Sequence, residues 1–236
     1  MPTTNAPGGE VCTMMTVSGT YTCNSTRVYV QSVAPGGTGQ DGTATLSGGG
    51  GSGGMALLGQ YFPVAPGTVL TIQIGAVGRP SGTTTVSGAL FPTLVLVGGR
   101  CASGASNYGE SNAGPLGAAY QAAGGDSSGN HGVFEGQWVG GGTGGSPPAA
   151  AASDDGREGG ARCGGIAGGL SGHDATGQNA GAGGASSPFG NGGKGGNATS
   201  PPIAATGYGA GGGGGARGSA NLAASAGSPS FVVLCS

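Results

Sequence analysis

The side chains that could carry acid–base chemistry are few: the chain has 2 histidines and 9 Asp and Glu residues. His131 and His173 both lie in glycine-rich sequence, and Asp174 directly follows His173. A carboxylate can orient an imidazole, but this neighbouring pair is more typical of a solvated surface. Residues 154–158 (Asp-Asp-Gly-Arg-Glu) lack the spacing of a calcium loop and indicate a turn with solvated charges. We therefore predict no catalytic residue, no metal site and no cofactor, and a protein that is not an enzyme.

Glycine motifs that elsewhere mark nucleotide or nucleophile sites also occur in this chain. Residues 48–53 match GxGxxG, and residues 50–54 match GxSxG. With 61 glycines in 236 residues, such matches arise by chance. The first motif requires a strand followed by a helix, and the second requires a strand–turn–helix with a downstream acid and histidine. Neither context follows, so we reject dinucleotide binding and a serine nucleophile.

Five cysteines could cross-link the chain: Cys12, Cys23, Cys101, Cys163 and Cys235. The odd number and the absence of a CxxC pair predict neither a complete disulfide framework nor a zinc site. Cys12 and Cys23 could face each other across a hairpin and form a bridge. Synthesis in a reducing compartment favours the other interpretation, in which the cysteines are free and partly buried thiols.

The composition points to an unusual folded scaffold. Charged residues make up 7% of the chain and the net charge is −2, whereas 36% of residues are apolar. Charged disorder is therefore a poor fit, and no long stretch keeps the uninterrupted register of collagen. Seven Lys and Arg residues without a basic stripe argue against nucleic acid and anionic membranes as partners. The first seven residues do not resemble a secretory signal, and the apolar runs are too short to span a membrane.

Residues 11–98 have the patterns of β-strands separated by turns. Leu70, Ile72 and Ile74 alternate with Thr71 and Gln73, as in a strand with one buried face. Helix signals are nearly absent. The predicted fold class is all-β, with a small sandwich of two sheets; its expected strands are 11–17, 20–23, 27–33, 55–64, 69–74, 83–86 and 93–97.

From residue 99 to residue 230, glycine replaces the strand pattern. Residues 141–146 and 191–197 repeat with a period of three, which matches the left-handed extended helix with three residues per turn. Such helices need hydrogen-bond partners outside themselves, so we predict a polyglycine-II-like bundle; a flexible linker is the alternative. Residues 231–235 read as a strand that returns to the N-terminal sheet. The predicted organisation is an N-terminal arm (1–10), a sandwich (11–98), a glycine-rich scaffold (99–230) and a closing strand (231–236).

Aromatic residues interrupt the glycine-rich part. Tyr108 and Tyr120 favour display on a binding surface, because aromatics beside Ser, Gly and Asn bind at low entropic cost. Phe189 and Trp138 lie beside the period-three repeats, where filling gaps in the bundle is favoured. The candidate receptor- or partner-contacting residues are Tyr108, Tyr120, His131 and Trp138.

The order of these features resembles the glycine-rich domains of tailed-phage tail-fibre and adhesin proteins. The resemblance is carried by Thr16–Cys23 with Thr26–Val30, the block Gly48–Gly54, the Pro-Gly turn within Val64–Gly78, the Ser-Phe-Gly unit in Gly183–Gly190, and the closing Gly211–Gly215 and Phe231–Leu234. It covers nearly the whole chain in order, although each piece is of low complexity. The attachment region and shaft of a tail fibre have no counterpart here.

The resemblance implies a virion protein, made in the host cytoplasm, that recognises a host surface through loops on a glycine-rich core. Its partners would be other virion proteins of a fibre, baseplate or capsid, and a host surface glycan or outer-membrane protein. Such proteins are homo-oligomers and often trimers. The alternative is a decoration protein that binds other virion subunits alone. A third possibility, a cell-wall or matrix protein, is disfavoured by the missing signal sequence.

Overall fold

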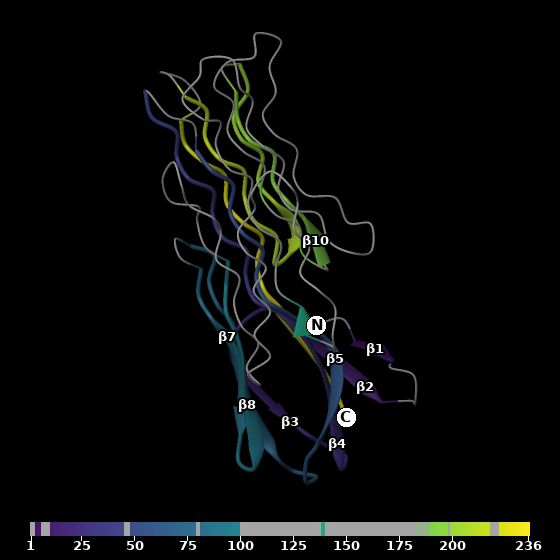
Figure 1. Cartoon of the computed structure of the whole chain (residues 1–236). Coiled ribbons are helices and arrows are strands. Elements are labelled where there is room, and N and C mark those ends of the chain that lie inside the picture. Colours follow the sequence, from purple (N-terminus) through teal and green to yellow (C-terminus); the bar gives the residue numbers. More distant parts are fainter. Residues whose placement is uncertain are drawn as a thin grey trace.

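The computed structural model describes residues 3–5, 10–44, 48–78, 81–99, 138–139, 184, 187, 189–197, 199–217 and 222–236. This part of the chain is built from antiparallel strands and confirms the all-β class. No helix that could cross a membrane occurs among these residues. A β-sandwich forms one end of the elongated molecule, and a bundle of extended segments forms the other (Figure 1).

The sandwich has two sheets, as predicted, and strands from outside residues 11–98 also join it. The larger sheet, sheet A, has six strands in the order β1-β2-β12-β4-β5-β9, and the smaller, sheet B, has four in the order β3-β6-β7-β8. The strands of sheet A are β1 (Thr3–Asn5), β2 (Val11–Met15), β12 (Phe231–Cys235), β4 (Arg27–Val33), β5 (Ala56–Pro63) and β9 (Trp138–Val139). Those of sheet B are β3 (Gly19–Thr22), β6 (Val69–Gln73), β7 (Thr84–Gly88) and β8 (Phe91–Leu96).

The core of the sandwich is made of side chains that alternate along these strands. On β6 the buried residues are Leu70 and Ile72, and Thr71 between them is exposed. Phe62 of β5 and Phe91 of β8 join the two sheets, with ring centroids 5.3 Å apart. Because a fully buried Leu, Ile or Phe side chain contributes about 1.5–3 kcal/mol, this alternation is sufficient reason for the two sheets to pack together.

The last strand of the chain completes sheet A, as the sequence predicted. β12 lies between β2 and β4 and pairs with both in antiparallel register. The register places Cys235 directly opposite Cys12, and the two form a disulfide with a Cα–Cα distance of 4.1 Å across a sequence separation of 223. The prediction of free thiols is therefore wrong for these two cysteines.

The alternative bridge between Cys12 and Cys23 is also wrong. Its premise was that residues 11–17 and 20–23 form a hairpin, but β2 belongs to sheet A and β3 to sheet B. Cys23 is a free, fully buried thiol in the core between the sheets. Cys101 and Cys163 lie outside the described residues.

Three long excursions of the chain leave the sandwich end, form most of the described bundle and return (Figure 1). The first runs from β4 to β5 through residues 34–55. The second joins β10 (Phe189–Asn191) to β11 (Thr206–Tyr208), and the third leads from β11 to β12 through residues 209–230. The chain between β6 and β7 joins the bundle near its base, where Thr38 N–H donates to the Gly78 carbonyl at 3.3 Å. The bundle thus draws on residues before 98 as well as on the glycine-rich part after it.

Hydrogen bonds between these segments recur at every third residue. The N–H groups of Gly48, Gly51 and Gly54 donate to the carbonyls of Gly215, Gly212 and Gly209 at 2.7–2.8 Å. Gly36, Gly39 and Gly42 donate in the same manner to Ser228, Ser225 and Leu222. The sum of the paired residue numbers is constant in each series, so these segments run antiparallel. A period of three with bonds to neighbouring segments confirms the predicted polyglycine-type bundle for the described segments.

Segment 209–216 lies at the centre of the bundle. It accepts hydrogen bonds from three other segments, 48–54, 193–196 and 225–228, and it donates hydrogen bonds to a fourth, 37–40. A Cβ added at Gly212 would overlap the backbone carbonyl of Ser225, and one at Gly215 would overlap that of Leu222. Glycine is required at these positions because backbones, and not side chains, are in contact.

One face of sheet A carries a second, smaller core. Phe231 of β12 lies between Phe189 of β10 and Tyr208 of β11, each with a ring-centroid distance of 5.0 Å. The β10–β11 hairpin therefore covers the upper part of the outer face of sheet A and ties the bundle to the sandwich.

Candidate functional site

The far end of the bundle is the first candidate site, because described residues of all three excursions lie together there. We call this region the distal tip: residues 42–44, 196–197, 199–200 and 216–217, with residue 222 (Figure 1). Gly42 N–H donates to the carbonyl of Leu222 at 2.7 Å, and Gly196 N–H donates to that of Gly214 at 2.9 Å. The Asp41 carboxylate accepts from Ala224 N–H at 2.8 Å. Hydrogen bonds between described residues thus join the first and the second excursion to the third at or near the tip.

The turn of the second excursion is organised by Asn197. Its side-chain oxygen accepts from the backbone N–H of Thr199 at 3.0 Å, from the Thr199 hydroxyl at 3.1 Å and from Ser200 N–H at 2.7 Å. Asn197 N–H also donates to the Ser200 carbonyl. An asparagine that closes its own turn in this way fixes the backbone, while Thr199 and Ser200 are exposed.

The chemistry offered by the described part of the distal tip is that of hydroxyl and peptide groups. Ionisable side chains near it are Asp41, Lys194 and Arg217, of opposite signs. Such a surface binds by hydrogen bonds and shape more than by net charge. It fits a neutral polyhydroxylated ligand better than a strongly charged one.

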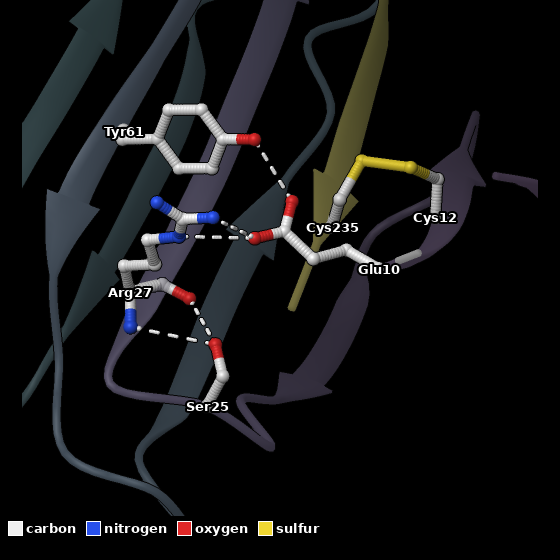
Figure 2. Close-up of polar contacts among 6 residues, drawn as sticks. All are labelled: Glu10, Cys12, Ser25, Arg27, Tyr61 and Cys235. Carbon is white, nitrogen blue, oxygen red and sulfur yellow. Dashed lines mark hydrogen bonds and ion pairs between the residues drawn. A yellow bond between two sulfur atoms is a disulfide. The ribbon is translucent and has the colours of Figure 1, made fainter. Parts of the chain in front are cut away.

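A second cluster lies on the sandwich and joins Glu10, Arg27 and Tyr61 (Figure 2). Glu10 accepts from the Arg27 guanidinium through one oxygen, at 3.0 Å, and from the Tyr61 hydroxyl through the other, at 2.9 Å. The Arg27 guanidinium also lies over the Tyr61 ring, 4.6 Å from its centroid. Tyr29 meets the Tyr61 ring edge-on, with centroids 5.3 Å apart. This arrangement ties the residue before β2 to β4 and β5.

The electrostatics of this cluster favour the protonated, neutral form of the Tyr61 hydroxyl. The hydrogen bond to Glu10 raises the pKa of Tyr61 above its usual value, and slight desolvation and the negative charge of Glu10 act in the same direction. Tyr61 is therefore a hydroxyl donor at neutral pH and not a phenolate. Burial likewise raises the pKa of the Cys23 thiol and opposes formation of a reactive thiolate.

Metal binding has no support in the part of the chain that the structure describes: within it, no group of three or more His, Cys, Asp or Glu side chains could hold an ion.

The residues predicted to contact a receptor are mostly not placed. Tyr108, Tyr120 and His131 lie outside the described residues. Trp138 begins β9, whose backbone pairs with Leu57 on β5 at the edge of sheet A. Phe189 was expected to fill a gap, and it does pack, against Phe231 on the sheet.

Three features of the site were missed from the sequence. A signal existed for the disulfide, since the predicted return of strand 231–235 to the first sheet brings Cys235 near a strand containing Cys12. No comparable signal marked Glu10, Arg27 and Tyr61, which come from three separate segments. The distal tip was also missed, although residues 197–200 (Asn-Ala-Thr-Ser) contain no glycine and so interrupt the glycine-rich sequence.

Comparison with known proteins adds no relative: no protein-family model matches the chain. No curated protein matches it either.

Proposed function

We propose that the chain is a phage virion protein of the tail-fibre or tail-tip adhesin type, which recognises a host surface through turns displayed on its glycine-rich bundle. The observation that carries the proposal is that described residues of three excursions lie together at the distal tip, at the end of the molecule remote from the sandwich. The resemblance of the sequence to phage adhesin domains supports it.

The construction of the bundle suits display. Its segments are fixed to one another at every third residue, and its centre has no space for a side chain at Gly212 or Gly215. Turns held on such a support lose little conformational entropy on binding, so weak individual contacts yield useful affinity. The exposed Thr199 and Ser200 then favour a surface glycan as the ligand.

The disulfide suits a particle exposed outside the cell. Disulfides form and persist at virion and cell surfaces, and they are rare in a reducing cytosol. Cys12 and Cys235 are both buried, with 4% and 1% of their surface exposed, so their bridge is protected from small reductants.

The test is binding of the purified full chain, fluorescently labelled, to a panel of intact bacteria by flow cytometry. The variant Ser200→Arg places a bulky charge on the distal tip, and Thr206→Arg places the same side chain on exposed β11 near the sandwich. We expect binding to at least one strain, a loss of at least about tenfold for Ser200→Arg, worth about 1.4 kcal/mol, and little change for Thr206→Arg.

A decoration protein that contacts virion subunits alone would give a different result. It would bind no strain, yet would co-sediment with purified virions or capsid shells. Equal loss of cell binding in both variants would also contradict the proposal, since the distal tip would then not be the contacting surface.

A further inference from the structure

The period-three repeat at 191–197 begins with Asn191-Gly192, the one place in the chain where glycine follows asparagine. An asparagine in this position can lose its side-chain amide without an enzyme. The main-chain nitrogen of the next residue attacks the carboxamide carbon, and glycine allows the attack because it has no side chain beside that nitrogen. The sequence identifies the dipeptide, but the fold decides whether its two reacting groups can meet.

Both reacting groups of Asn191-Gly192 are accessible in the folded chain. Asn191 is exposed as the last residue of β10, and Gly192 is half-buried in the irregular segment that follows. Within the described part of the chain, neither the Asn191 carboxamide nor the Gly192 N–H makes a hydrogen bond. The attack therefore breaks no hydrogen bond of either group, and it takes place where the strand has ended.

Asp41-Gly42 is also followed by a glycine and shows how the fold can prevent such a ring closure. Its attacking group is held, because Gly42 N–H donates to the Leu222 carbonyl at 2.7 Å. Its carbonyl side is held as well, because the Asp41 carboxylate accepts from Ala224 N–H at 2.8 Å. A carboxylate is in addition a poorer target than a carboxamide. This site is therefore protected in the bundle, whereas Asn191-Gly192 is not.

Two further described asparagines are less suited to the reaction. Asn197 is not followed by glycine, and its side-chain oxygen accepts hydrogen bonds from Thr199 and Ser200. Asn24 is exposed, but the side chain of Ser25 crowds the attacking nitrogen.

From these observations we infer that Asn191 is a site of spontaneous deamidation in the folded protein. The Gly192 nitrogen forms a bond to Cγ of Asn191, and the side-chain nitrogen leaves as ammonia, taking the proton of the N–H. The resulting succinimide ring then takes up one water molecule, which opens it at either carbonyl. One product is aspartate, and the other is isoaspartate, in which the main chain runs through the former side chain. The inference does not depend on host recognition by the distal tip.

The modification falls on the hairpin that joins the bundle to the sandwich. Asn191 pairs with Thr206 between β10 and β11. The same hairpin packs Phe189 and Tyr208 against Phe231 of sheet A. Isoaspartate inserts an extra carbon into the main chain at residue 191, so the pairing with Thr206 is disturbed and the hairpin holds the sheet less tightly. Both products also add a negative charge to a chain whose net charge is −2.

Incubation of the purified full chain for several weeks at mildly alkaline pH, followed by peptide mapping with mass spectrometry, tests the inference. We expect residue 191 to show the mass change of an amide NH2 replaced by OH, ahead of every other described asparagine. Isoaspartate at this position is measured by labelling with an isoaspartyl methyltransferase. Gly192→Ala should slow the change several-fold, and Asn191→Gln should abolish it over the same period.

The matched control is the same chain unfolded in guanidinium chloride, where only the sequence acts. If Asn191 stays intact in the folded chain and is deamidated in the unfolded one, the fold protects the site and the inference is overturned. Faster conversion at Asn24, or isoaspartate at Asp41, would overturn it too. For the hairpin, the fall in thermal midpoint on ageing should be larger in the wild type than in Asn191→Gln. Equal falls would contradict the loosening of the hairpin.

Discussion

The sandwich and the bundle both bury backbone N–H and C=O groups that must be hydrogen-bonded, but they are packed in opposite ways. In the sandwich, large side chains such as Leu70 and Leu94 fill the space between two sheets, and the backbones of the sheets are kept apart by about 10 Å. In the bundle, backbones lie in direct contact, and glycines such as Gly212 and Gly215 leave no space for a side chain. One region is therefore stabilised mainly by apolar burial and the other by a dense set of hydrogen bonds.

This difference teaches that a chain can be rigid without a conventional core. Glycine loses more conformational entropy on folding than any other residue, so a glycine-rich segment folds only if its groups are satisfied. Here serine hydroxyls satisfy two backbone donors of the central segment. Ala210 N–H donates to the Ser228 hydroxyl and Gly213 N–H donates to the Ser225 hydroxyl, each at 2.7 Å. The two regions should accordingly respond in opposite ways to a change of side-chain volume.

The largest expected effect follows from adding one methyl group at the centre of the bundle. Gly212→Ala would place a Cβ on the carbonyl of Ser225, and neither backbone can move without breaking its own hydrogen bonds. We expect a loss of about 4 kcal/mol or more in the free energy of unfolding, measured by chemical denaturation.

The control for Gly212→Ala lies in the sandwich. An alanine at Gly19 meets only the flexible end of Met15, at 3.1 Å, so Gly19→Ala should change stability by less than about 1 kcal/mol. Equal tolerance of the two substitutions would show that the bundle is looser than its contacts indicate.

Removal of the disulfide should have the next largest effect, because it joins strands that are far apart in the sequence. Cys12→Ala combined with Cys235→Ala should cost about 3–4 kcal/mol, since the closed loop is long. The thermal midpoint of the double variant, compared with that of Cys23→Ala, measures the contribution of the bridge apart from simple loss of a thiol. If the two midpoints agree, the strand pairing of β12 suffices without the bridge.

In the sandwich, removal of volume should be costly. Leu94→Ala deletes a side chain that is 2% exposed and should lower the free energy of unfolding by about 3 kcal/mol. Ala210→Gly, which removes a buried methyl group in the bundle, should cost at most about 1 kcal/mol. A larger effect for Ala210→Gly than for Leu94→Ala would reverse the comparison between the two regions.

The smallest expected effect is a pH dependence of stability that arises from Tyr61 in the sandwich. The raised pKa of Tyr61 means that its neutral form is favoured in the folded state, so this contribution is complete below about pH 10, the ordinary tyrosine pKa, and is lost as the pH rises further. Glu10→Gln should shift the Tyr61 titration to lower pH, monitored by phenolate absorbance with Tyr61→Phe as the reference. An unchanged titration in Glu10→Gln would show that Glu10 is not the cause.

Much of the sandwich could be predicted from local patterns. Residues 27–33 and 231–235 were predicted with the bounds that β4 and β12 have, because β-branched and apolar residues alternate between clear turn signals. The prediction failed for β2 and β3, which look like a hairpin in sequence but enter different sheets. A short Ser-Gly turn does not reveal which sheet the next strand will join, and the pairing of Cys12 was missed for that reason.

The sequence by itself determined the local structure and composition of this protein: strands with one apolar face, a period of three in the glycine-rich part, and very few charges. These follow from composition and spacing, which act over a few residues. The tertiary structure alone decided which distant segments meet, namely Cys12 with Cys235, Glu10 with Arg27 and Tyr61, and the described residues of three excursions at the distal tip. The glycine segments are so similar in sequence that the sequence does not specify which of them pair. Their neighbours are set by the positions of the sandwich strands to which they are joined. Function, in our proposal, depends on that second level of organisation.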